Sequence, residues 1–143
     1  MKKRIVALLT AAMLVCGSVT CYAVSPQASR YFDGYILGLS ALGNCKMAVS
    51  FSVLGTREMD QIGAYSIRVE EEVAKDTWET TFTAYGDDDP DNFYTYDFCD
   101  HTGSFTFFGV PNVRYRAVLV AYARNSSGEE YSDEVICTPK TCK

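Results

Sequence analysis

Residues 110–138 are VPNVRYRAVLVAYARNSSGEEYSDEVICT, and this stretch decides the fold class. A long, mostly apolar run extends from Tyr115 to Ala123, and a second run extends from Tyr131 to Cys137. Between them stands Asn125-Ser126-Ser127-Gly128, a combination of residues that favours a tight turn. The stretch therefore predicts two strands joined by a short hairpin loop.

Five further segments upstream carry the same signal. Their apolar residues alternate with small or polar neighbours, and a period of two is typical of half-buried strands. Turn-forming residues separate them at 42–44, at 55–56, from 86 onwards and at 109–112. No segment has a convincing helical stripe, although 69–74 could make a turn. The expected strands cover 35–41, 47–53, 65–69, 78–84 and 105–107.

Seven short strands with frequent turns predict an all-β fold. This number of strands in one domain is typical of an antiparallel sandwich of the immunoglobulin or fibronectin type III class. A five-stranded barrel is the alternative. The chain has 143 residues, which is the size of a single domain.

The first 23 residues have the features of a secretory signal peptide. Three basic residues, Lys2 to Arg4, precede an apolar run, and Cys21-Tyr22-Ala23 supplies small residues at the usual cleavage positions. The run is too short and too interrupted for a membrane anchor. Lipidation at Cys16 or Cys21 is a minor alternative, because neither follows a small residue. We therefore expect a signal peptide over 1–23, a sandwich over 24–143 and a secreted product.

The charge of the exported part excludes one class of partner. Removing 1–23 removes three positive and no negative charges, which leaves 10 Lys and Arg against 18 Asp and Glu, a net charge of −8. Phosphate contacts need clustered Lys and Arg, so nucleic acid is not an expected partner. No second long apolar segment follows residue 23, so we expect no membrane span in the mature chain.

Four cysteines remain after removal of the signal peptide: Cys45, Cys99, Cys137 and Cys142. An even number in an exported chain predicts two disulfides. Alternating strand directions place Cys45, Cys137 and Cys142 at one end, so we favour Cys45 bonding to Cys137 or Cys142 and leave Cys99 open. The spacing matches no zinc motif. Free thiols in an anaerobic habitat are the alternative.

The stretch 110–138 also resembles the last two strands of a fibronectin type III domain. That family has a loop with Pro, a Tyr opening the penultimate strand, alternating apolar residues, an Ala-x-Asn-x-x-Gly hairpin and a Ser before the final strand. Those positions are filled here by Pro111, Tyr115, Val118 or Leu119, Ala123, Asn125, Gly128 and Ser132. Tyr115 lies eight residues before Ala123, against about six in the family, so we expect a longer strand or a bulge.

Most of the mature chain is similar to a family of small secreted domains of Gram-positive (clostridial-type) bacteria that has no assigned function. The likeness lies in Tyr31, Phe51-Ser52-Val53, Met59 to Ala64 and Ala123 to Gly128. It implies a sandwich fold and supplies no chemistry.

An acidic stretch offers a weak calcium motif. Asp87, Asp89 and Asp91 have the alternate spacing with which a calcium loop begins. The sixth loop position is Asn92 instead of Gly, and the twelfth is Phe98 instead of Glu. We favour a solvated turn, and keep calcium as the alternative in a chain that otherwise needs no cofactor.

Four aromatic residues could form a binding surface for a sugar ring or a protein partner. Aromatic side chains combine a large contact area with a polar tip, which enriches them at binding surfaces. Trp78 shares its face with Phe82, and a single Trp in a strand of a sandwich is most often in the core, so the core is favoured for Trp78. The other three lie in the run from Asn92 to Phe98, which has aromatics on both faces. The predicted surface comprises Phe93, Tyr94, Tyr96 and Trp78.

Catalytic patterns are weaker still. Glycoside hydrolysis needs two carboxylates across a cleft, and Glu70 and Glu71 point to opposite faces of a strand. A charged strand edge that discourages pairing explains the glutamate run more simply. His101 lies beside Asp100 and near Ser104, but no nucleophile-elbow motif surrounds a serine, so we expect a loop histidine without a catalytic role.

The sequence therefore favours a secreted, non-enzymatic domain that binds or spaces at or outside the cell envelope, with an extracellular glycan or protein as partner. A small hydrolase acting on glycans through Glu72, Glu79 or the aspartate cluster is one alternative. A calcium-stabilised structural domain is the other.

Overall fold

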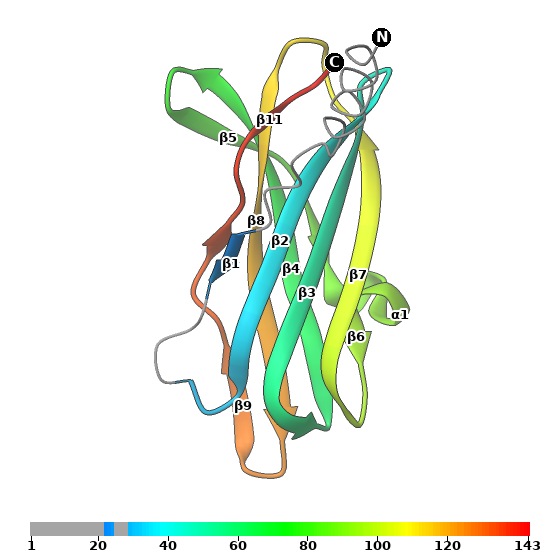
Figure 1. Ribbon diagram of the computed structural model, residues 1–143, viewed down its shortest axis with the longest axis vertical. Coiled ribbons are helices and arrows are strands. Elements are labelled where there is room, and N and C mark those ends of the chain that lie inside the picture. Colours follow the sequence, from blue (N-terminus) through cyan, green and yellow to red (C-terminus); the bar gives the residue numbers. More distant parts are fainter. Residues whose placement is uncertain (1–21, 25–28) are drawn as a thin grey trace, which may run out of the picture.

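The computed structural model describes residues 22–24 and 29–143, which form two antiparallel sheets packed face to face (Figure 1). Sheet A has the strand order β1-β2-β3-β7. Sheet B has the order β10-β8-β4-β5, with β6 paired to β4 and with β9 and β11 paired to β8. The predicted all-β sandwich is confirmed, and the barrel alternative is wrong because the two sheets stay separate. The predicted signal peptide lies outside the described residues except for its last two positions.

The strands of sheet A are β1 (Tyr22–Val24), β2 (Phe32–Gly43), β3 (Lys46–Met59) and β7 (Phe98–Phe108). The strands of sheet B are β4 (Gln61–Ala74), β5 (Thr77–Tyr85), β6 (Tyr94–Thr95), β8 (Arg114–Asn125), β9 (Gly128–Tyr131), β10 (Val135–Ile136) and β11 (Lys140–Thr141). Two single-turn helices, η1 (Gly86–Asp88) and α1 (Pro90–Phe93), connect β5 to β6. Within the described residues, no helix is long and apolar enough to cross a membrane.

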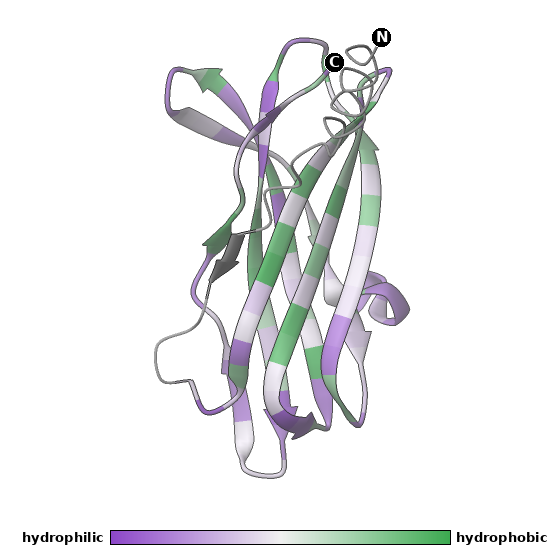
Figure 2. Cartoon of the chain, viewed as in Figure 1, coloured by the Kyte–Doolittle hydropathy of each residue, from purple (hydrophilic) through white to green (hydrophobic). Residues whose placement is uncertain are grey.

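The core lies between the two sheets and follows from alternation along the strands. In β3, Met47, Val49, Phe51 and Val53 are all buried, and green bands alternate with pale ones along β2 and β3 in Figure 2. Opposite them, the inward positions of β8 are largely alanines, which leave room for the larger side chains of sheet A. Both the period of two and the sandwich follow directly from the sequence.

Strand lengths differ from the sequence-based prediction. The turn expected at 55–56 is absent, because β3 continues through it to Met59 and pairs again with β7 after a break in register between Leu54 and Met59. The turn at 69–74 is absent too, since β4 continues to Ala74. Between β3 and β4, the single residue Asp60 carries the chain from sheet A to sheet B.

Two bulges decide which side chains face outward on sheet B. A register shift between Ala64 and Ser66 leaves Tyr65 without a partner in β8. A second shift pairs Val69 with Phe82 and Glu70 with Thr80, so Thr81 is the extra residue of β5. Because successive side chains alternate between faces, one extra residue moves the rest of a strand to the opposite face.

Tyr115 at the start of β8 ties the loop before it to the sheet. Its buried hydroxyl accepts a hydrogen bond from the backbone nitrogen of Val110 at 2.9 Å. This hydrogen bond fixes the loop from Gly109 to Val113 at the start of β8. β8 extends from Arg114 to Asn125, so Tyr115 and Ala123 lie on one continuous strand.

Candidate functional site

The four aromatic residues predicted to form a binding surface are not brought together. Phe93 points into the core and stacks on Phe105, with ring centroids 6.0 Å apart. Tyr94, its neighbour in the chain, points to the outer face of sheet B, where it is buried under other groups. Tyr96 is exposed in the turn before β7. Phe93 ends α1 and packs in the core with Phe105, whereas Tyr94 begins β6 and contacts Tyr122 on the outer face, so the two side chains do not share one surface.

Trp78 lies on the outer face of sheet B instead of sharing a face with Phe82. The bulge at Thr81 separates the two positions, so Phe82 packs inward against Phe105 and Phe107. Two arginines of β8 cover the indole of Trp78, with the guanidinium carbons of Arg116 and Arg114 at 4.5 and 5.9 Å from the ring centroid. Trp78 is therefore half-buried by cation–π contacts within the protein itself.

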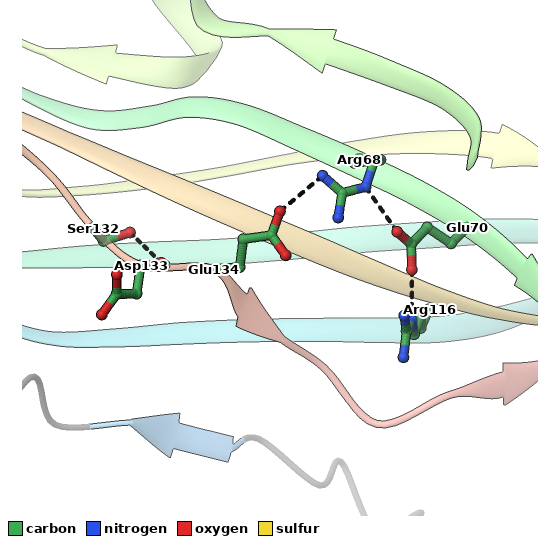
Figure 3. Close-up of polar contacts among 6 residues, drawn as sticks. All are labelled: Arg68, Glu70, Arg116, Ser132, Asp133 and Glu134. Atoms are coloured by element: carbon green, nitrogen blue, oxygen red, sulfur yellow. Dashed lines mark hydrogen bonds and ion pairs between the residues drawn. The ribbon is translucent and has the colours of Figure 1, made fainter. Parts of the chain in front are cut away.

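The glutamate run of β4 belongs to the same cluster, not to a strand edge as predicted. β4 is a central strand between β8 and β5, and Glu70 is buried between two arginines (Figure 3). Its carboxylate oxygens lie 2.7 Å from Nε of Arg68 and 2.6 Å from Nε of Arg116. We call the set of paired side chains the arginine–glutamate network: Arg68, Glu70, Glu72, Arg114, Arg116 and Glu134.

The network extends from β4 to the segment before β10. Ser132 fixes that segment against β8, because its hydroxyl accepts a hydrogen bond from the Ala121 nitrogen at 2.8 Å and donates one to the Asp133 carbonyl at 2.8 Å. Glu134 is thereby placed 3.0 Å from Arg68 (Figure 3). Arg114 pairs separately with Glu72 at 2.8 Å. Positive and negative side chains alternate throughout, so the network is internally neutralised.

The pKa of Glu70 shows that the network holds its carboxylate ionised. Burial raises the pKa of this group, but the hydrogen bonds from Arg68 and Arg116 outweigh burial and leave the pKa below its ordinary 4.5. The pKa of Glu72 is also lowered, first by the backbone nitrogen of Asp76 and then by Arg114. A general acid in glycoside hydrolysis needs a raised pKa, so both shifts oppose that role.

A second cluster occupies the other end of the same face, toward β9 at the bottom of Figure 1. It consists of tyrosines contributed by five different strands, each in ring contact with the next. We call it the tyrosine surface: Tyr85, Tyr65, Tyr131, Tyr122 and Tyr94, in the order of contact.

Three members of the tyrosine surface are open to solvent. Tyr65, Tyr85 and Tyr131 are 36%, 46% and 49% exposed. Tyr65 contacts both of the others edge to face, at 5.1 Å and 89° to Tyr131 and at 6.2 Å and 75° to Tyr85. Within the described part of the chain, no hydrogen-bond partner is found for these three hydroxyls. Their rings and hydroxyls are therefore free to contact another molecule.

The other two members form a floor beneath them. Gly63 of β4 is opposite Tyr122 on one side and Tyr94 on the other. The rings of these two tyrosines contact each other, with centroids 6.1 Å apart. A β-carbon at Gly63 would lie 1.9 Å from the Phe93 carbonyl oxygen, so only glycine permits this approach of β6 to β4. Gly86 also packs closely against Tyr94, because a β-carbon at Gly86 would lie 2.5 Å from the Tyr94 hydroxyl. These contacts hold the floor in one arrangement.

Carboxylates border the tyrosine surface on two sides. The Tyr122 hydroxyl donates to Glu129 at 2.7 Å. Burial first, and then this carboxylate, raise the pKa of Tyr122 to about 12. Asp87 follows Gly86 directly, and after burial its charge is the largest influence that raises the pKa of Tyr94. Arg124, opposite Glu129 in the β8–β9 pair, is the nearby cation, and its charge lowers the pKa of Tyr122.

The aspartates of the weak calcium motif are exposed in η1 and α1 and in the residue between them. Among residues 22–24 and 29–143, no group of three or more His, Cys, Asp or Glu side chains is placed to hold a metal ion. Calcium binding at Asp87, Asp89 and Asp91 therefore has the spacing alone in its favour.

His101 is a buried strand residue and not the loop histidine that was predicted. Its Nε2 donates to the Asn92 carbonyl oxygen at 2.7 Å, and Nδ1 lies 2.5 Å from the Thr95 hydroxyl. The Asn92 side chain in turn bonds the backbone of Ser104. Both ring nitrogens are thus engaged in holding α1 and β6 against β7, which leaves neither free to activate a serine.

The predicted disulfides are not formed in the structure, where no pair of the four cysteines lies at bonding distance. Cys45 and Cys142 do come together at one end, as expected, because the Cys45 nitrogen donates to the Lys143 carbonyl at 2.9 Å. Burial, followed by a hydrogen bond with the Cys45 thiol, raises the pKa of Cys142 to about 11. Cys137 is buried against Ala117, and Cys99 is exposed at the opposite end.

Four of the five members of the tyrosine surface were not predicted from the sequence. One signal was present: Tyr122 stands between Ala121 and Ala123, and large side chains next to small inward ones mark an outward aromatic position. Tyr65 and Tyr85 carry no such signal, because their positions depend on a bulge and on a strand end.

Comparison with known proteins adds no assignment: no family model, no curated protein and no solved structure matches the chain.

Proposed function

We propose that the chain is a secreted, non-enzymatic binding domain and that the tyrosine surface is its ligand-binding face. One observation supports this most: three neighbouring exposed tyrosines, on a rigid sheet, have hydroxyls without a partner in the described part of the chain. Tyrosine supplies contact area at low conformational cost, which enriches it at binding surfaces. A signal peptide over 1–23, as the sequence predicts, supports a binding face that acts outside the cell.

The non-enzymatic part of the proposal is supported by the positions of the catalytic candidates. The His101 ring is engaged at both nitrogens. Glu72, named for the hydrolase alternative, pairs with Arg114 and has a lowered pKa. Glu79 is exposed on β5, opposite Glu71. The exposed position of Glu79 and the ion pair of Glu72 do not favour the two-carboxylate arrangement that glycoside hydrolysis needs.

A retention screen tests the proposal. The purified protein is applied to insoluble polysaccharides, mucin, bacterial cell walls and immobilised envelope proteins, each with and without calcium. We expect retention on one matrix that is lost in Tyr65→Ala and Tyr131→Ala. Tyr96→Ala is the matched control, because Tyr96 is equally exposed but lies outside the tyrosine surface. Retention that survives both surface variants would refute the proposed binding face.

The calcium alternative is tested by the same samples. A calcium-stabilised domain melts at a higher temperature with calcium than with chelator, since a ligand that binds only the folded state stabilises it. We expect equal melting temperatures in the two conditions. A calcium-dependent rise that Asp89→Asn abolishes would favour the calcium-stabilised domain instead.

A further inference from the structure

The outer face of sheet B already contains one complete recognition site for a guanidinium group. Arg116 lies 4.5 Å from the centroid of Trp78 while its Nε contacts the Glu70 carboxylate at 2.6 Å. Arg114 makes the same two kinds of contact: its guanidinium lies 5.9 Å from the centroid of Trp78 and pairs with the Glu72 carboxylate. The aromatic ring contacts the planar face of the guanidinium, and the carboxylate accepts hydrogen bonds from its N–H groups.

The tyrosine surface has the same two components without an arginine. Its rings are Tyr65, Tyr85 and Tyr131, and its carboxylates are Glu129 and Asp87. Within the described residues, no guanidinium or ammonium lies over any tyrosine ring, since the cation–π contacts found there are those of Trp78. Arg124 is opposite Glu129 in the backbone register of β8 and β9 and does not cover a ring.

The ring geometry argues against a flat sugar as the occupant. Successive exposed rings are turned by 75° and 89°, so they present no common plane on which a pyranose could stack. Perpendicular rings instead offer a face and an edge around one small group. A cation is attracted to the negative ring face, and the carboxylates at the border add to that attraction.

Resting on the proposed function, we infer that the tyrosine surface binds arginine side chains of a basic polypeptide segment. The guanidinium lies over Tyr131 or Tyr65 and donates to Glu129, in the arrangement that Arg116 has with Trp78 and Glu70. The net charge of −8 expected for the mature chain steers such a segment toward the domain.

The test is isothermal titration calorimetry of the purified protein with a short oligoarginine peptide. The matched control is the same peptide with citrulline, which keeps the shape and removes the charge. We expect binding of oligoarginine and none of the citrulline peptide. Tyr65→Leu combined with Tyr131→Leu leaves the charge unchanged and should weaken binding about tenfold, as expected for two exposed cation–π contacts. Tyr96→Leu should bind as the wild type does.

Two results would overturn the inference even where oligoarginine binds. Equal affinity for the citrulline peptide would show that charge is irrelevant. Equal affinity of the double leucine variant would assign binding to the general negative charge of the domain. If the leucine variant does not fold, as judged by circular dichroism, Glu129→Gln replaces it and should weaken binding about threefold, as expected for the loss of one exposed ion pair.

The outcomes also separate this inference from the proposed function. Tyrosine-dependent retention on a polysaccharide, with no oligoarginine binding, would refute the inference and leave the binding face in place. If no ligand depends on Tyr65 or Tyr131, both fail together.

Discussion

The two halves of the outer face of sheet B both combine aromatic rings with carboxylates, but they differ in whether arginines cover the rings. The half near β11 carries the arginine–glutamate network, where every charge has a partner and Trp78 is covered by two arginines. The half near β9 carries the tyrosine surface, where no cation among the described residues lies over the exposed rings. Satisfied polar groups stabilise a fold, whereas unsatisfied exposed ones are available to a ligand. We therefore assign structure to the first half and binding to the second.

The largest effect is expected where the floor of the tyrosine surface depends on glycine. In Gly63→Ala, the new methyl group would lie 1.9 Å from the Phe93 carbonyl oxygen, so β6 must move away from β4. We expect a loss of about 3 kcal/mol in the free energy of unfolding, measured by urea denaturation. Gly34→Ala is the control, because its nearest neighbour would be 4.0 Å away. Equal stability of the two variants would contradict the packing described.

In the charged half, we expect Glu70→Gln to cost about 2 kcal/mol. The substitution leaves Arg116 without an ion-pair partner among the described residues, whereas Arg68 keeps Glu134 at 3.0 Å. An unpaired charge at a half-buried site is destabilising. The expected cost is smaller than for a fully buried ion pair, because both arginines remain in contact with water. Tyr131→Leu, on the exposed half, should change stability by less than about 1 kcal/mol. If the two costs are reversed, the assignment of the halves is wrong.

The stability difference between wild type and Glu70→Gln should depend on pH. The folded pKa of Glu70 lies below its ordinary 4.5, so ionised Glu70 stabilises the folded state above pH 4.5. That contribution is lost as the pH falls from 4.5 through the lower folded pKa. Urea midpoints of the two proteins should therefore converge in acid. A difference that stays constant from neutral pH into strong acid would show that the ion pairs do not produce it.

We expect the cysteine thiols at the two ends of the molecule to differ in their reactivity toward an alkylating reagent. Cys99 is exposed at the end that carries the tyrosine surface, whereas Cys137 and Cys142 are buried toward the other end. Burial raises the pKa of both buried thiols, which disfavours the reactive thiolate. Alkylation followed by mass spectrometry should label Cys99 first. All four thiols of the mature chain should react in denaturant, and fewer would show that a disulfide is present.

The general architecture could be predicted from the sequence, but the outer surface could not. Alternation in β3 and β8 and the turn at Asn125 to Gly128 are local signals, and they predict strands and the sandwich correctly. The glutamate run was wrongly expected at an edge, because strand order within a sheet is a long-range property.

The aromatic positions depended on register. Trp78 and Tyr65 acquired their positions from single-residue bulges that no local pattern announces. The tyrosine surface joins five strands, so its members become neighbours only once the register of the whole sheet is known. The folded sheet, and not any motif, creates this site.

The most direct test of the account measures ligand retention for Tyr131→Leu and Glu70→Gln side by side, at a temperature where both are folded. The account predicts that Tyr131→Leu loses retention while remaining nearly as stable as the wild type, and that Glu70→Gln keeps retention despite its lower stability. Loss of retention in Glu70→Gln together with full retention in Tyr131→Leu would contradict it.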